Sequence, residues 1–491
     1  MWRELVNIYI PGDKKGSQIH KGLYSDKQLI NVLRWYLVGI KKNDIIEIEI
    51  TDISGQGSGI GRYEGMAVFV PQTVVGDIIN ARILKVKKNY AFAKIENIVI
   101  PSESRTEVDC DCFYKCGGCV FRHIAYEREL EIKEKRVYDA LTRIGKVDNF
   151  FMRSIVGCSN PNNYRNKSQI PIGKDKNGSV IMGFYGKHSH RIIDCQKCRL
   201  HPPVFDRIAE IVRSWIDDYD ISIYDEERHI GILRHLYIRY AQKGGQIMVC
   251  LVINGHRLPY SDELVKRLTG GIETIKSILV NSNCEKTNVI LGKECTTIYG
   301  KGYITDELCG LKFNISPLSF YQVNRDQAET LYGLVKDYAQ LTGNEYVIDL
   351  YCGTGTIGLS MADMAKKILG VEIIPQAIKN AKENAKINEI TNAEFTCSDA
   401  AAAADRLVLN NTKPDVVIVD PPRKGCDTIV IDSIHKMSPK RVIYVSCDPE
   451  TLARDLNLFT KYGYTVEEVT PVDMFPRTEH VETVCLLSRN S

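Results

Sequence analysis

A buried strand followed at once by a glycine-rich loop constrains the fold more than any other part of the sequence. Val347 to Tyr351 reads as a short core strand, and Gly353, Gly355 and Gly358 follow it at the start of a helical stretch. Glycines permit a tight turn and let a ligand approach the backbone, and the helix N-terminus behind them presents free N–H groups. The pattern predicts a nucleotide-type cofactor site on an α/β sheet.

Apolar strands alternate with helices throughout the sequence after Gly310, which predicts an open parallel sheet. The second strand ends at Glu372, where a carboxylate suits a ribose diol. The third ends in Asp420, followed by Pro421 and Pro422. The glycine pattern alone fits either a dinucleotide or S-adenosylmethionine. An acid before two prolines suits methyltransferases that hold a planar base beside the cofactor, so S-adenosylmethionine is favoured over a dehydrogenase cofactor.

Cys447 follows a further strand and precedes Asp448 and Pro449, which suit the N-cap and the first turn of a helix. This places a thiol at the positive end of a helix, where we expect its pKa to be lowered and the nucleophilic thiolate enriched. Glu482 lies in an otherwise apolar strand, where burial would raise the pKa of its carboxyl group and make it a candidate base. An edge-strand glutamate facing water is the alternative.

The remaining sequence divides by composition. Residues 1–40 form an N-terminal extension to which we assign no role. Residues 41–101 have the short alternating strands and glycine-rich turns of a small β-barrel, with basic and aromatic residues interleaved as on a surface for single-stranded nucleic acid. Residues 102–309 form an α+β central domain, and residues 310–491 form the α/β Rossmann-like domain. We expect a multidomain chain that acts as a monomer.

The sixteen cysteines and the charges also bear on compartment and partner. No secretory signal and no apolar stretch long enough to span a membrane is present, so we expect a reducing, cytoplasmic setting in which clustered cysteines bind metal. The formal net charge is only +3. Residues 153–199 are nevertheless strongly basic, with Arg165, Lys167 and Arg191 among nine Arg and Lys residues, as an RNA phosphate-binding surface requires.

Four motifs occurring in order resemble the RNA uridine-C5 methyltransferase family, over about residues 41–491. They are the Gly353 to Gly358 loop, Asp420-Pro421-Pro422-Arg423, Ser446-Cys447-Asp448-Pro449 and His480-Val481-Glu482. The resemblance is greatest to the branch with a TRAM barrel and an iron–sulfur domain, which acts on large-subunit (23S) ribosomal RNA. It implies that Cys447 is the nucleophile, which adds to C6 of uracil, and that Glu482 accepts the C5 proton.

The same resemblance implies ligands for two cofactors. Residues that bind S-adenosylmethionine in the family correspond to Gln322, Tyr351, Glu372 and Asp420, with Asp399 a weaker candidate. Four cysteines match the spacing of a [4Fe–4S] cluster and are Cys110, Cys116, Cys119 and Cys198. Cys112 and Cys195 are extra, and a zinc site built from the pairs 112/116 and 195/198 is the alternative.

Other functions fit this sequence less well. A cytosine-C5 methyltransferase carries its nucleophile directly after Asp-x-Pro, where this chain has Arg423. A dehydrogenase gives no reason for the acid and two prolines or for the basic central segment. A non-catalytic RNA-binding iron–sulfur protein needs neither Cys447 nor Glu482. Transfer RNA is the alternative substrate to ribosomal RNA.

Overall fold

The computed structural model describes residues 6–9, 19–22 and 40–489. It divides into two compact units, residues 1–105 and 106–491. Within the first unit, β1 (Val6–Tyr9) and β2 (Ile19–Gly22) form an antiparallel pair. The rest of the predicted N-terminal extension up to residue 39 lies outside the described residues. No helix in the described ranges is long and apolar enough to cross a membrane.

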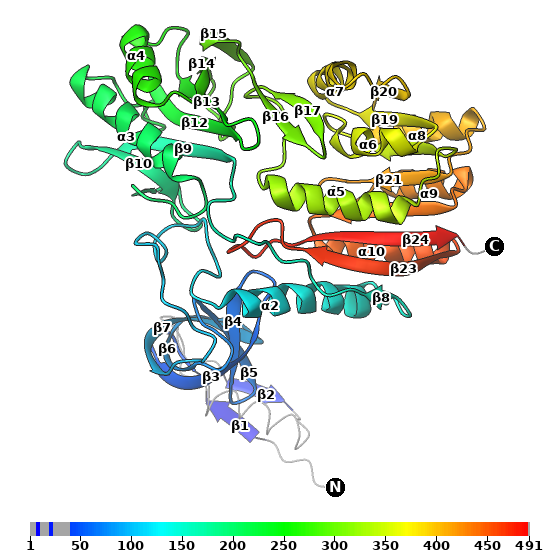
Figure 1. Ribbon diagram of the computed structural model, residues 1–491. Helices are drawn as coiled ribbons and strands as arrows, with labels where there is room; N and C mark the ends of the chain where they lie inside the picture. Colours follow the sequence, from blue (N-terminus) through cyan, green and yellow to red (C-terminus); the bar gives the residue numbers. More distant parts are fainter. Residues whose placement is uncertain (1–5, 10–18, 23–39, 490–491) are drawn as a thin grey trace. The chain divides into compact units, whose positions relative to one another are not determined.

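A closed barrel of five strands follows, as the alternating pattern predicts (Figure 1). On its first strand Ile46, Ile48 and Ile50 are buried, while Glu47 and Glu49 between them are exposed. Five strands in the order β3-β4-β5-β7-β6 close the barrel, and closure leaves no free sheet edge. The strands are β3 (Ile45–Ile53), β4 (Ser58–Tyr63), β5 (Met66–Pro71), β6 (Ile78–Val86) and β7 (Tyr90–Ile100).

The second unit contains a seven-stranded sheet in the order β11-β10-β9-β12-β13-β14-β15. Two helices pack on it, α3 (Pro203–Asp218) and α4 (Ser261–Gly271), and the fully buried Trp215 lies in the core. The strands are β9 (Lys167–Lys174), β10 (Val180–Tyr185), β11 (Ile192–Asp194), β12 (Leu233–Ala241), β13 (Gln246–Ile253), β14 (Ile275–Ser282) and β15 (Glu294–Gly300). A hairpin of β16 (Ile304–Leu308) and β17 (Leu311–Ile315) follows.

The second sheet of this unit has eight strands in the order β20-β19-β18-β21-β22-β24-β23-β8. The five strands from β20 to β22 are parallel, as predicted, but β24 runs antiparallel to both neighbours. The expected open parallel sheet is therefore a mixed one. The strands are β8 (Phe151–Met152), β18 (Tyr346–Leu350), β19 (Lys367–Glu372), β20 (Ala393–Cys397), β21 (Val416–Val419), β22 (Arg441–Ser446), β23 (Tyr464–Val472) and β24 (Glu482–Arg489).

Helices cover both faces of this sheet (Figure 1). One core contains α5 (Arg325–Ala339), α6 (Thr356–Ser360), the short η2 (Ala362–Met364) and α7 (Pro375–Ile387). The other contains α8 (Ala400–Leu409), α9 (Thr428–Met437) and α10 (Pro449–Lys461). It also contains α2 (Tyr126–Asp139) and the π-helical turn η1 (Ala140–Ile144). Residues 126–152, which composition groups with the central domain, thus build part of the eight-stranded layer.

Candidate active site

The glycine loop lies directly after β18, and it turns through left-handed backbone. Tyr351, Gly353 and Gly355 have φ of 66°, 56° and 80°, and Gly355 is the N-cap of α6. At Gly355 a Cβ atom would lie 3.0 Å from the ring of Phe395. Glycine is required here for both backbone and space, as the sequence predicts.

Glu372 ends β19 beside this loop. Its carboxylate accepts hydrogen bonds from the backbone N–H groups of Gly353, at 3.2 Å, and Ile374, at 2.8 Å. The carboxylate is therefore held at the rim of the loop, half-buried, where a ribose would lie. Beneath the loop Asp349 is fully buried and accepts from Gly358 N at 3.1 Å, and burial followed by the nearby Asp420 raises its pKa to about 8.

Cys447 lies between β22 and α10, in a turn fixed by its neighbours. Asp448 is the N-cap and accepts from Thr451 N at 2.9 Å, and Ser446 Oγ donates to Asp448 O at 3.0 Å. These local predictions are confirmed, but the expected lowering of the thiol pKa is wrong. Burial, followed by the carboxylates of Glu482 and Asp420, raises the pKa of Cys447 to about 11. Desolvation, followed by the two carboxylates, sets the direction of the shift even though Cys447 lies just before a helix.

Glu482 reaches the same edge because β24 runs antiparallel to β22. In this register Ser446 pairs with Thr483, so the residues beside them, Cys447 and Glu482, lie at the same end of the sheet. Glu482 is 6% exposed and begins an interior strand, so the alternative of an edge-strand glutamate facing water is wrong. Burial, followed by the charge of Asp420, raises the pKa of Glu482 to about 8.

Asp420 follows β21, the neighbour of β22, and its charge acts on both Cys447 and Glu482. Burial raises the pKa of Asp420 to about 7. The end of the sheet therefore gathers three predicted residues that reside on different strands, with one thiol and two carboxyl groups. The pKa of each of these three groups is raised above its ordinary value.

Two further side chains enter this site that the sequence did not single out for a role. Arg423 lies after the prolines, and its charge lowers the pKa of both Cys447 and Glu482 against the effect of burial. Arg423 Nη2 lies 3.2 Å from His480 Nε2. Both residues belong to the sequence motifs quoted above, so the sequence indicates their place in the site but predicts no chemical role for them.

The other predicted cofactor residues are less closely grouped. Tyr351 is half-buried after β18, with its hydroxyl beside the buried Cys426. Gln322 lies in the segment between β17 and α5, where its backbone carbonyl accepts a hydrogen bond from Asn166 Nδ2 at 2.8 Å. Asp399 is the N-cap of α8 and accepts from Ala401 N at 3.0 Å. Within the described residues no hydrogen bond joins the side chain of Gln322 to Glu372 or Asp420.

The cysteines of the central segment converge on one cavity of about 180 Å³. Burial, followed by the nearby Cys119 and Cys116, raises the pKa of Cys198 to about 12. The described part of the chain nevertheless contains no group of three or more His, Cys, Asp or Glu side chains arranged to hold a metal ion. The iron–sulfur site therefore stays a prediction. The cysteines lining the cavity are Cys110, Cys112, Cys116, Cys119, Cys195 and Cys198.

Two segments of the chain match known protein families. Residues 281–490 match the tRNA (Uracil-5-)-methyltransferase family, and residues 41–95 match the TRAM domain. An uncharacterized RNA methyltransferase of Clostridium tetani is 45% identical over 451 residues, 92% of this chain and 98% of that protein. One from Halalkalibacterium halodurans is 43% identical over 448 residues, 91% and 98% of the respective chains. The chain belongs to the RNA uracil-5-methyltransferase family.

A solved structure agrees with this assignment. The tRNA (uracil-54, C5)-methyltransferase of Pyrococcus abyssi, in complex with S-adenosyl-L-homocysteine, has a TM-score of 0.73 and 28% sequence identity. The match covers 90% of this chain and 99% of that one. The chain is thus an S-adenosylmethionine-dependent RNA uracil-5-methyltransferase with an N-terminal TRAM barrel, and these predictions are confirmed.

Proposed function

We propose that this methyltransferase uses Cys447 as its nucleophile and Glu482 as its general base. The observation that carries the proposal is the antiparallel register of β22 and β24, which brings the two residues to one end of the sheet beside Asp420. C5 of uracil is too weak a nucleophile to be methylated directly. Addition of the Cys447 thiolate to C6 places negative charge on C5 and O4 and so activates C5.

Glu482 acts after C5 has been methylated. Its carboxylate removes the proton from C5, the electron pair re-forms the C5–C6 double bond, and the bond between C6 and the Cys447 sulfur breaks. The thiolate is then free for another turnover. S-adenosylmethionine supplies an electrophilic methyl group, and Gln322, Tyr351, Glu372 and Asp420 are the residues proposed to hold it. The glycine turn and the carboxylate of Glu372, fixed by Gly353 N, fit that role.

Two substitutions separate the catalytic roles. Cys447→Ala should abolish methyl transfer and retain S-adenosylhomocysteine binding. Glu482→Gln should transfer one methyl group and then remain covalently attached to methylated RNA, because no base removes the C5 proton. Denaturing electrophoresis with label from the cofactor methyl group measures the adduct. Cys397→Ala, at an exposed cysteine ending β20, is the control and should turn over normally. Normal turnover by Glu482→Gln without adduct would show that another group is the base.

We propose large-subunit ribosomal RNA as the substrate, as the family branch implies, in the cytoplasm. Transfer RNA is the second candidate, since the similar Pyrococcus abyssi enzyme is a tRNA (uracil-54, C5)-methyltransferase. Mass spectrometry of nucleosides from separately purified ribosomal and transfer RNA of a deletion strain decides between them. Loss of 5-methyluridine from ribosomal RNA supports the proposal. Loss from transfer RNA alone overturns it.

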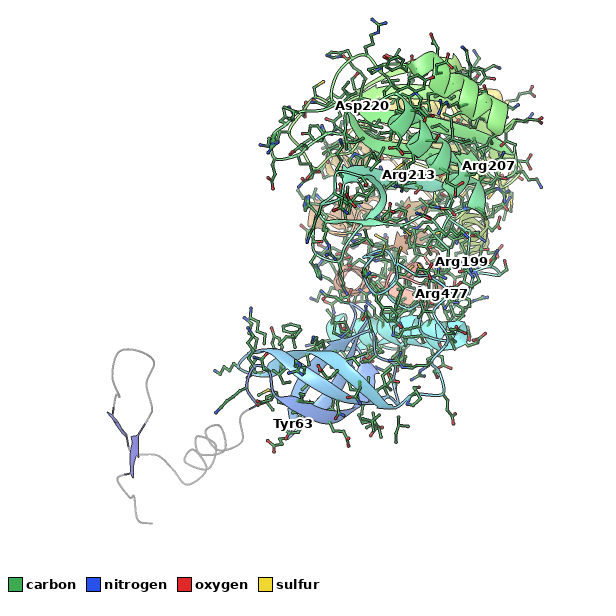
Figure 2. The ribbon with its side chains drawn as sticks, turned by 90° about the vertical axis from the view of Figure 1, so that its left-hand side faces the viewer. Tyr63, Arg199, Arg207, Arg213, Asp220 and Arg477 are labelled. Atoms are coloured by element: carbon green, nitrogen blue, oxygen red, sulfur yellow. The ribbon has the colours of Figure 1, made fainter. Side chains whose placement is uncertain are left out.

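We also propose that Cys110, Cys116, Cys119 and Cys198 hold a [4Fe–4S] cluster. The fit rests on their shared cavity, which is also lined by cations that would offset the negative charge of a thiolate-bound cluster. A cubane binds one thiolate at each of four separate iron corners, so its ligands surround more space than those of one zinc ion. The lining cations are Arg122, Arg165, Lys167 and Arg199, the last labelled in Figure 2.

Iron content tests this ligand set. Anaerobically purified protein should be brown, and alanine at any of the four proposed ligands should remove colour and iron. Cys112→Ala is the matched control, because Cys112 lines the same cavity but is outside the proposed set. It should keep both. Colourless protein with stoichiometric zinc would contradict the proposal.

A further inference from the structure

Helix α2 presents a row of polar side chains to the segment that leads into Glu482. Spacings of three and four residues place the members of the row on one face of the helix. The buried Lys133 Nζ donates to Glu129 Oε1 and to Asp473 Oδ1, both at 2.7 Å. Arg477 N, from the residue labelled in Figure 2, donates to Glu129 Oε1 at 2.6 Å. The members of the row are Tyr126, Glu129, Lys133 and Arg136.

Arg136 hydrogen-bonds two segments, and each of them leads to or from a proposed catalytic residue. Its Nη1 donates to Glu479 O at 2.9 Å, three residues before Glu482. Its Nη2 donates to Glu450 Oε2 at 2.9 Å and Oε1 at 3.1 Å, and Glu450 lies three residues after Cys447, in the first turn of α10. One guanidinium group therefore links the segments that carry the two proposed catalytic groups.

The planar guanidinium is suited to this link. Arginine offers several donors in a rigid arrangement, so two acceptors bound to one group are fixed relative to each other. A lysine carries its donors on one nitrogen, so it cannot reproduce the two-point contact with the Glu450 carboxylate together with the bond to Glu479 O. The Arg136 side chain is 20% exposed, so water competes only in part for these hydrogen bonds.

We propose that Arg136 is a positioning residue, which sets the distance between Cys447 and Glu482 by holding Glu450 and Glu479 together. The proposal rests on the function proposed for those two residues. The Cys447 turn keeps its own hydrogen bonds, from Ser446 Oγ to Asp448 O and from Thr451 Oγ1 to Arg423 O. Loss of Arg136 should therefore displace Glu482 more than Cys447, and elimination should slow more than addition.

The test is Arg136→Gln in the full-length protein. Turnover should fall by about 10- to 100-fold, the effect of a small misplacement of reacting groups, while KM for S-adenosylmethionine stays within about twofold. Methylated RNA should accumulate as the covalent adduct during turnover. Arg136→Lys should not restore the rate. Arg143→Gln is the matched control, since Arg143 is 73% exposed and its ion pair within the described residues is with Asp139, four positions earlier.

Glu450→Gln tests the link from the other side. It should lower turnover less than Arg136→Gln, and the double variant should be no slower than Arg136→Gln, because both changes break one connection. Additive losses, rescue by Arg136→Lys, or an adduct level like that of Arg143→Gln would each overturn the proposal. Loss of S-adenosylhomocysteine binding in Arg136→Gln would also overturn it by showing a general structural role. If Cys447→Ala remained active, the proposed function itself would fail, whatever Arg136→Gln does.

Discussion

At the residue scale, activity should follow the ionisation of two buried groups. In the proposed mechanism Cys447 and Glu482 act in their deprotonated forms, and burial raises their pKa values to about 11 and about 8. We expect kcat to rise with pH through about 8, as Glu482 ionises, and to rise further toward about pH 11, as Cys447 ionises. Arg423→Gln should shift this rise to higher pH, because Arg423 lowers both pKa values. Single-turnover rates measure the shift. An unmoved profile would remove Arg423 from the electrostatics of the site.

The raised pKa of Glu482 also affects stability. The folded protein keeps this carboxyl protonated up to about pH 8, whereas the unfolded chain ionises near its ordinary value, so the free energy of unfolding falls as pH rises between them. Glu482→Gln does not ionise and should become more stable than the wild type as pH increases from about 5 to 9. Thermal unfolding across this range measures the widening difference in Tm. Glu383→Gln, at an exposed glutamate of α7, should show none.

Sequence motifs located these residues, but their ionisation depended on what the fold places around them. The helix N-terminus next to Cys447 is visible in the sequence as Asp448 and Pro449. Burial at the end of the sheet, followed by the charges of Glu482 and Asp420 from other strands, reverses the expected direction of the Cys447 pKa shift. The pKa of Cys447 depends on residues that are distant in the sequence, so the residues next to it in the chain do not predict it.

At the scale of the element, the loop between β18 and α6 should tolerate no side chain at Gly355. Gly355→Ala would strain left-handed backbone and press a Cβ against Phe395. We expect a lower Tm and a loss of S-adenosylhomocysteine affinity of about tenfold by calorimetry. Gly463→Ala is the control, since Gly463 has φ of 82° with no atom within 4 Å of the added Cβ. It should lower Tm and leave the affinity unchanged. Equal affinities in both variants would contradict a role for this loop in cofactor binding.

The direction of β24 was the part of the sheet that sequence reasoning missed. Apolar strands alternating with helices identified β18 to β22, because each parallel connection requires a crossover helix. The segment between β23 and β24 contains no helix, and a direct connection of this kind allows the antiparallel arrangement observed. Strand β8 was also not predicted. It has only two residues, which is too short for an alternating pattern in the sequence, and it joins the edge of a sheet formed by distant residues.

At the scale of the whole molecule, RNA binding by the barrel should be separable from chemistry in the second unit. Phe69, Tyr90 and Phe92 pack against one another, with ring centroids 5.4 to 5.9 Å apart, and Tyr90 and Phe92 are 37% and 41% exposed. Bases stack on such rings, and nearby cations attract the phosphates. The exposed cations on β6, on β7 and between them are Lys85, Lys87, Lys88 and Lys94.

Replacing both Tyr90 and Phe92 by alanine should weaken RNA binding by roughly 10- to 100-fold. Methyl transfer at saturating RNA and S-adenosylhomocysteine affinity should be unchanged. Fluorescence anisotropy with RNA gives the affinity. A double alanine variant at Ile98 and Val99, also exposed on β7, should bind normally. Equal losses in the two double variants would mean that general apolar area, and not aromatic stacking, binds the RNA.

The contacts of α2 also bear on how the protein is made. Lys133 bonds Asp473 across 340 positions of the chain, and Tyr126 bonds the same residue across 347. During translation, α2 leaves the ribosome long before its partners exist, with a buried ion pair still unformed. The nascent chain cannot complete the eight-stranded sheet and the helices on it until synthesis is nearly finished. Contacts between residues this far apart in the sequence also slow folding. A truncated product of translation would therefore be unable to modify RNA.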